Sequence, residues 1–181
     1  MAKTLLLSQV FRGTSVMNAL VIDTFEFCRT NSSRDGVTPV AEMTRLAKEC
    51  ADASGEIAWK AVGSTHKLGF PQMTLSVNGI VQLICQRCLQ PYAHHLDSST
   101  VLMLGKDDEQ ADEIEATIDD ESIDVIVGSR SMELMYLVED EALLALPQSP
   151  RHDVCPDSSL LDKAKSEKIS PFDALKSLKS E

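Results

Sequence analysis

The sequence predicts an α+β fold in which an antiparallel β-sheet packs with two main helices and a short C-terminal helix. Three observations support this fold class. From residue 54 to residue 104 apolar and polar side chains alternate with a period of two, which is typical of half-buried strands joined by short turns. Residues 38–50 and 131–147 instead place apolar side chains every three or four positions, as an amphipathic helix does. Residues 170–179 repeat this helical spacing.

One domain is predicted for most of the chain. With 181 residues, of which 43% are hydrophobic, the chain is long enough for one domain with a substantial core and short for two. The domain is expected to span residues 17–155, because a strand-like run follows Met17. Residues 1–16 are expected to be an extension ahead of an alternative start at Met17. Residues 156–181 are expected to form a linker and the terminal helix.

The first third of the domain is predicted to be a strand, a loop and a helix. Residues 18–28 look strand-like, and the polar turn formers of residues 29–37 predict a loop. The first main helix should begin with Thr38 as its cap and Pro39 at its first position. Its buried stripe is expected to consist of Met43, Leu46, Ala47 and Cys50.

Each strand of the sheet is expected to bury every second side chain. Residues 78–79, Asn-Gly, interrupt the second strand either as a tight hairpin turn or as a bulge within one long strand. A third strand is expected from Tyr92 to about Leu104. The buried positions of the first two strands are expected to be Ile57, Trp59 and Ala61, then Met73, Leu75, Val77, Val81 and Leu83.

The second main helix should follow two short strands, at Ile118 and at residues 123–127. Ser131 is expected to open this helix and Pro147 to stop it. Its buried side is predicted to carry Leu134, Leu137, Val138 and Leu144, and its exposed side Glu133, Glu139, Asp140 and Glu141.

The charge is unevenly distributed along the chain, whose net value is −11. Residues 1–106 contain ten Lys/Arg and eight Asp/Glu, whereas residues 107–181 contain seven and twenty. The densest stretch, residues 107–124, has ten acids and no base, and it is expected to be an acidic loop. Such a block repels phosphates. Two interpretations stay open: a solvated loop, or a surface that mimics RNA or docks a protein.

Two short motifs carry the chemistry of metal ligands. Cys85-Gln86-Arg87-Cys88 lies at the end of a predicted strand, and His152-Asp-Val-Cys155 follows the second main helix. Two cysteines separated by two residues can direct both sulfurs to one ion, because a tight turn brings their side chains together. Thiolate and imidazole ligands suit tetrahedral zinc. The predicted site is therefore a structural zinc ion held by Cys85, Cys88, His152 and Cys155.

The Cys85/Cys88 pair also has three alternatives to zinc binding. A thioredoxin-like redox pair would need a helix N-terminus within a βαβ unit, whereas this pair precedes another strand. A stable disulfide is disfavoured in a reducing compartment. The third alternative is a turn whose thiols merely pack.

No enzyme class is supported by the sequence. It contains no P-loop, no G-x-G-x-x-G, no G-x-S-x-G and no H-E-x-x-H motif. Four protein ligands on zinc would also leave no open position for a substrate. No apolar run approaches the ~18 residues that span a bilayer. We therefore expect a cytoplasmic, membrane-independent protein that is not an enzyme.

Four segments of the chain together form a recognisable pattern. They are Cys85-Gln-Arg-Cys-Leu-Gln-Pro-Tyr92, the acidic helix ending in a Leu-Pro step at residues 137–147, Pro150-Arg-His152 with Cys155, and the Ser-Pro-Phe helix at residues 170–179. In these segments the chain resembles the YceD family of large ribosomal RNA subunit accumulation proteins. The resemblance implies a role in the synthesis, processing or stability of 23S rRNA. The implied partner is ribosomal RNA or a ribosome-assembly protein, and no DNA is expected.

Two functions are compatible with these observations. The first is a non-enzymatic accessory factor for 23S rRNA. The alternative is a metal- or thiol-responsive regulatory protein that uses the Cys85/Cys88 pair. Any direct RNA contact is expected to use cations of the less acidic half, namely Arg45, Lys48, Lys60, Lys67, Arg87 and Lys106.

Overall fold

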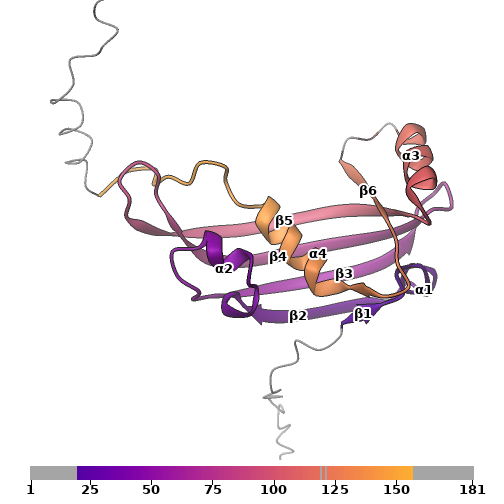
Figure 1. Ribbon diagram of the computed structural model, residues 1–181, viewed down its shortest axis with the longest axis horizontal. Helices are drawn as coiled ribbons and strands as arrows, with labels where there is room; N and C mark the ends of the chain where they lie inside the picture. Colours follow the sequence, from indigo (N-terminus) through magenta and orange to yellow (C-terminus); the bar gives the residue numbers. More distant parts are fainter. Residues whose placement is uncertain (1–19, 119, 121, 157–181) are drawn as a thin grey trace, which may run out of the picture.

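The computed structural model describes residues 20–118, 120 and 122–156. In this part of the chain a five-stranded sheet is accompanied by a two-stranded sheet and by helices, so the predicted α+β class is confirmed (Figure 1). In chain order the elements are β1 (Val21–Ile22), α1 (Thr24–Arg29), β2 (Ser33–Pro39), the 3-10 turn η1 (Val40–Glu42), α2 (Leu46–Glu49), β3 (Glu56–Thr65), β4 (Pro71–Ile84), β5 (Pro91–Gly105), α3 (Asp108–Thr117), β6 (Ile123–Val127), β7 (Met132–Glu133) and α4 (Leu134–Leu144).

The large sheet has the strand order β2-β3-β4-β5-β6. β3, β4 and β5 pair antiparallel, as predicted, whereas β2, which was not predicted as a strand, pairs antiparallel with β3 at the edge and β6 pairs parallel to β5. A parallel neighbour needs a crossover connection, and α3 lies within that crossover. The small sheet pairs β1 with β7 antiparallel and so ties the start of the described chain to the start of α4. In Figure 1, α4 lies across one face of the large sheet.

The hydrophobic core lies between this sheet face and α4. The side chains predicted to be buried in β3 and β4 are confirmed, since all eight are buried. Leu134, Val138 and Ala142 of α4 are fully buried against them. No helix in the described part of the chain has the length and apolar character to cross a bilayer.

β4 runs as one continuous strand through Asn78 and Gly79, without a hairpin or a bulge. Gly79 pairs with Ile57 on one side and Leu96 on the other, in unbroken register. A Cβ at this position would lie 2.5 Å from the carbonyl oxygen of Glu56. Glycine is therefore required here for the close approach of two strands.

Two predictions for the first third of the domain are wrong. Residues 25–28 are helical within α1, because the Asp23 carboxylate accepts hydrogen bonds from the backbone N–H groups of Phe25 and Glu26 and so caps the helix. Most of the predicted loop at residues 29–37 belongs to β2, which pairs with β3 along its whole length.

The predicted helix over residues 38–50 is also wrong. Thr38 and Pro39 end β2, and the Thr38 hydroxyl accepts a hydrogen bond of 3.0 Å from Trp59 Nε1. Only η1 and the four residues of α2 are helical in this stretch. Met43 and Leu46 are nevertheless buried as expected.

The acidic stretch is not a loop throughout, because residues 108–117 form α3. The Asp107 side chain caps this helix by accepting from Gln110 N at 2.9 Å, and Ile114 is its fully buried anchor. Ile118 ends α3 instead of forming a strand, whereas the strand predicted at residues 123–127 is confirmed as β6.

The predicted faces of α4 need correction. The helix begins at Leu134, and Leu144 is 78% exposed instead of buried. Glu139 and Glu141, expected outside, are each only 6% exposed. Both carboxylates are satisfied where they lie: Glu139 accepts from the backbone of α2, and Glu141 accepts from the Ser98 hydroxyl.

Two expectations fall outside the described residues. These are the extension at residues 1–16 and the short C-terminal helix predicted for residues 170–179.

Candidate metal centre

Cys85 and Cys88 occupy the turn that joins β4 to β5. The turn is closed by two backbone hydrogen bonds, from Cys85 N to Gln90 O at 3.0 Å and from Leu89 N to Cys85 O at 2.8 Å. Leu89 takes a left-handed conformation with φ of 61°. The tight turn directs both sulfurs inward, and both cysteines are buried.

The segment after α4 supplies the other two side chains. Its backbone is held against the turn by a hydrogen bond from Gln86 N to Pro150 O at 2.8 Å. A second bond joins the Ser149 hydroxyl to Gln86 Oε1 at 3.0 Å. This pairing places His152 and Cys155 over the two turn cysteines, and Figure 1 shows the segment running beside the β4–β5 turn.

The structure brings all four predicted ligands together. One donor atom from each of Cys85, Cys88, His152 and Cys155 lies within 4.8 Å of all the others. The Sγ atoms of Cys85 and Cys155 are 3.8 Å apart, and Cys88 Sγ is 3.4 Å from His152 Nδ1. A tetrahedral ion with Zn–S bonds of ~2.3 Å and Zn–N bonds of ~2.0 Å requires S–S edges of ~3.8 Å and S–N edges of ~3.5 Å. The cluster could therefore hold a metal ion of this size.

The electrostatics of the cluster favour a cation among the sulfurs. Burial raises the pKa of the Cys85 thiol, but hydrogen bonds from the backbone N–H groups of Cys88, His152 and Arg87 outweigh burial and lower it to about 5. Burial and the neighbouring sulfurs raise the pKa of Cys88. One cysteine of the cluster is therefore readily deprotonated, whereas deprotonation of a second cysteine is unfavourable. A divalent ion bound between the sulfurs would remove this penalty.

Arg87 supports the cluster from outside. Its Nε donates to Cys155 Sγ at 3.0 Å and its Nη2 donates to the carbonyl oxygen of His152 at 3.0 Å. The hydrogen bond to Cys155 raises the pKa of this guanidinium. The sequence predicts Arg87 to be a possible RNA contact, but the structure assigns it to the support of the cluster. Its position between the two cysteines is the sequence signal for this role.

Arg45, another expected RNA contact, is also engaged. Its Nε donates to Glu139 Oε2 at 2.9 Å and its Nη1 donates to Asp140 Oδ1 at 2.5 Å. This arginine therefore ties α2 to α4, and its charge is compensated by two carboxylates.

A hollow of about 590 Å³ opens beside the cluster. Its walls come from the start of β5 and from residues 147–154. The Tyr92 ring lies 5.0 Å from the His152 ring and 6.3 Å from the His94 ring, measured between centroids. Arg151 also lines this hollow, with an exposed side chain.

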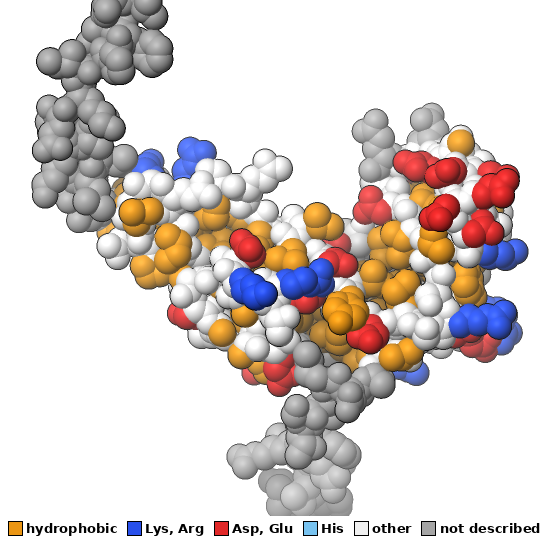
Figure 2. Space-filling view, viewed as in Figure 1, with side chains coloured by type: hydrophobic (Ala, Val, Ile, Leu, Met, Phe, Trp, Pro, Cys, Tyr) orange, Lys and Arg blue, Asp and Glu red, His pale blue; other side chains and the backbone are white. Residues whose placement is uncertain are grey.

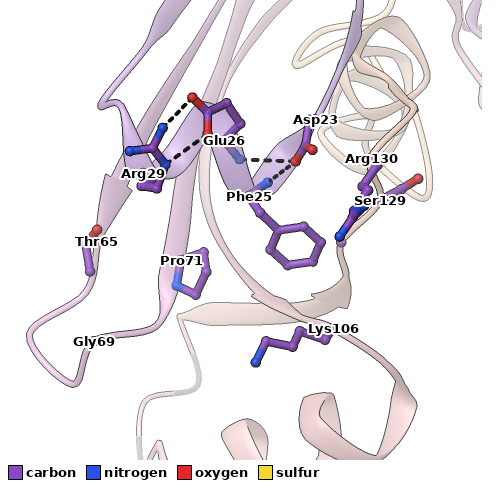
Figure 3. Close-up of a pocket in the computed structure, with 11 residues that line it drawn as sticks. Asp23, Phe25, Glu26, Arg29, Thr65, Gly69, Pro71, Lys106, Ser129 and Arg130 are labelled. Atoms are coloured by element: carbon purple, nitrogen blue, oxygen red, sulfur yellow. Dashed lines mark hydrogen bonds and ion pairs between the residues drawn. The ribbon is translucent and has the colours of Figure 1, made fainter.

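A larger hollow of about 850 Å³ lies beside α1, at the other end of the sheet (Figure 3). Asp23 is committed to capping α1, and Arg29 pairs with Glu26 at 2.6 Å. Lys106 and Arg130 also line it, and among the described residues neither forms an ion pair. The acidic helix α3 follows Lys106 directly and opposes the binding of an anion there.

These features define an α+β protein built on a long, mostly antiparallel sheet, with a Cys₃His cluster of metal-ligand geometry at one end. A family model described as large ribosomal RNA subunit accumulation protein YceD matches residues 73–179. The chain belongs to the YceD family. The match spans more than half of the chain and includes all four cluster residues. No solved structure matches the chain significantly.

Proposed function

We propose that this protein is a non-enzymatic accessory factor in the synthesis, processing or stability of 23S rRNA. Membership of a family named for large ribosomal RNA accumulation carries the proposal. The factor would act in the cytoplasm on ribosomal RNA or on a ribosome-assembly protein. The closed character of the cluster supports a role in binding, because its four protein donors leave no position for a substrate.

The proposed occupant of the cluster is one structural zinc ion, held by Cys85, Cys88, His152 and Cys155. Sulfur and imidazole donors at these separations suit zinc better than a hard cation. When bound, the ion would neutralise the thiolates and cross-link the β4–β5 turn to the segment after α4. Arg87 would compensate the remaining negative charge through its hydrogen bond to Cys155.

The alternative, a thiol-responsive regulator, has less support. A thiol that senses oxidants must be reachable from solvent. Cys85 is 0% exposed and Cys88 is 1% exposed. The low pKa of Cys85 does supply a thiolate, so counting reactive thiols on the folded protein separates the two functions. Slow reaction at the Cys85/Cys88 pair is expected for the accessory factor, and fast reaction for the regulator.

The test of the proposed function is the ratio of 23S to 16S rRNA in a strain that lacks the protein. Deletion should lower this ratio, and the wild-type gene should restore it. A Cys85→Ser/Cys88→Ser gene should restore it only in part if the zinc-held turn matters, whereas the control Cys50→Ser, outside the cluster, should restore it fully. An unchanged ratio in the deletion strain across growth conditions would contradict the proposal.

A further inference from the structure

We infer that the hollow beside the metal cluster is a binding site for single-stranded RNA. In this site an unpaired base stacks against the rings of Tyr92 and His94, and Arg151 contacts a backbone phosphate. The inference rests on the proposed function, since it names how the protein would touch ribosomal RNA.

The aromatic lining is the first argument. Tyr92 and His94 lie two positions apart on β5 and therefore project from the same face of the sheet. Their rings meet edge to face with an interplanar angle of 75°, and the His152 ring is tilted by 43° against Tyr92 on the other side. Tyr92 and His94 are only half buried, so ring surface remains open to the hollow. Unstacked RNA bases are bound on such aromatic surfaces.

The local charge is the second argument. Residues 85–95 and 147–156, which build this end of the molecule, contain only one acid, Asp153, which lines the hollow together with Arg151. Arg87 also lies at this end, where it offsets the negative charge of the cysteines. Asp and Glu side chains gather instead over α3 at the far end, as Figure 2 shows. RNA would therefore be repelled less strongly from the cluster end than from the α3 end.

The freedom of Arg151 is the third argument. Arg45 pairs with two carboxylates, and Arg87 is held by Cys155 and His152. Arg151 donates only to the neighbouring Ser149 hydroxyl, at 3.1 Å, and forms no ion pair with any described residue. It is therefore the guanidinium of this hollow that a phosphate can reach without breaking an existing ion pair.

The size of the hollow agrees with this ligand. About 590 Å³ lies within the usual range of small-ligand sites, so one nucleotide fits and a packed protein helix does not. Its lining consists mostly of aromatic, polar and charged side chains, unlike the largely apolar groove on which a protein segment would pack. We therefore favour RNA over a protein as the occupant.

The experiment is fluorescence anisotropy of the full-length, zinc-containing protein with a labelled single-stranded RNA of about ten nucleotides, titrated between about 50 and about 200 mM salt. The wild type should bind at low salt. Tyr92→Leu and His94→Ala should each weaken binding about fivefold or more, as expected for the loss of a stacked base. Arg151→Gln should lower the slope of log K against log salt by about 0.7, the value of one single-strand phosphate contact.

The matched control is Arg130→Gln, which removes the same charge from an arginine at the opposite end and should leave binding unchanged. Zinc content and melting temperature of each variant establish that the fold is intact. His94→Ala changes a half-exposed ring, so it keeps the test valid if Tyr92→Leu fails to fold. Absence of RNA binding by the wild type would overturn the inference, and so would equal losses in Arg151→Gln and Arg130→Gln.

This result and the test of the proposed function are separable. If deletion lowers the 23S to 16S ratio but the protein binds no RNA, the accessory role stands and the stacking site is wrong, with a protein as the occupant of the hollow. If RNA binds through Tyr92 and Arg151 but deletion leaves the ratio unchanged, the site stands and the proposed function is wrong.

Discussion

Glu139→Gln should destabilise the protein, although the sequence pattern places Glu139 on the solvent side of its helix. Glu139 is 6% exposed, and its carboxylate joins α4 to α2. Its Oε1 accepts from the backbone N–H groups of Arg45, at 2.7 Å, and Leu46, at 3.1 Å, and its Oε2 accepts from Arg45 Nε at 2.9 Å. The amide of glutamine can keep the two backbone bonds with its oxygen. Its NH₂ group would then face the donor Nε of Arg45.

The expected loss is one charge-assisted hydrogen bond. Such bonds contribute about 1.5–3 kcal/mol, and the low end applies because the Arg45 side chain is 41% exposed and remains partly solvated. We expect a loss of about 1.5–2 kcal/mol in the free energy of unfolding. Asp140→Asn is the matched control: it removes the other carboxylate from Arg45, but this side chain is 49% exposed and should cost less than about 1 kcal/mol.

The loss should depend on pH in a defined direction. Burial raises the pKa of Glu139, but the hydrogen bonds from Leu46 and Arg45 outweigh burial and lower it below the ordinary value of 4.5. A lowered folded pKa means that the stabilisation is fully present above the pKa of the unfolded chain. It is lost as the pH falls through the folded pKa. The difference between wild type and Glu139→Gln should therefore be constant near neutral pH and shrink below about pH 4.5.

The assay is urea unfolding of wild type, Glu139→Gln and Asp140→Asn, followed by the single tryptophan and repeated from neutral to acid pH. Equal stability of the two variants would refute the reasoning, because it would mean that burial gives Glu139 no greater role than its exposed neighbour. A difference that persists unchanged in acid would refute the assigned pKa shift.

Three further predictions concern the metal, the sheet and a helix cap. Elemental analysis of protein purified without metal-affinity resin should give about one zinc per chain, and Cys88→Ser should lose it and melt about 5 °C lower or more, unlike Cys50→Ser. Wild type that contains no zinc as purified, together with a Cys88→Ser variant that melts at the wild-type temperature, would contradict this. Gly79→Ala should lower the free energy of unfolding in urea by about 2 kcal/mol or more, because its Cβ would lie 2.5 Å from a carbonyl oxygen that the β3–β4 register fixes. An unchanged free energy of unfolding would show that β3 and β4 can move apart to accommodate the Cβ. Asp23→Ala should cost about 1 kcal/mol by the same assay, through loss of the α1 cap, whereas Asp23→Asn should not.

The central strands were predictable because their signal is local. Alternation of buried and exposed positions survives in β3 and β4 since each strand has one face on the core. The same reasoning fails at β2, where the exposure pattern of an edge strand carries little alternation. Thr38-Pro39 is a frequent helix start and also an acceptable strand end. Pairing with β3 decided between them, and hydrogen bonds to a distant strand leave no mark on the local sequence.

The site was predictable in composition but not in geometry. Cys85 and Cys88 form a motif that can be recognised within four residues, whereas His152 and Cys155 reach them only because of where α4 ends. The supporting contacts were hidden for the same reason: Gln86 meets Pro150, and Arg87 meets Cys155, across more than sixty residues of sequence. Residue type indicates ligands, but only tertiary structure indicates which groups hold the ligands in place.

Three attachments hold successive parts of the chain around α4: the β1–β7 pairing, the buried Glu139 and the Cys₃His cluster. β7 pairs with β1 just before α4 begins. Glu139, in the middle of α4, accepts hydrogen bonds from α2, and the cluster contains two of the residues that follow α4. The first two attachments consist of hydrogen bonds within the protein, so they do not depend on a metal. Loss of zinc should therefore free residues 147–156 without detaching α4. The walls of the RNA site proposed here come from that segment and from β5, so its RNA affinity should depend on zinc more strongly than the stability of the sheet does.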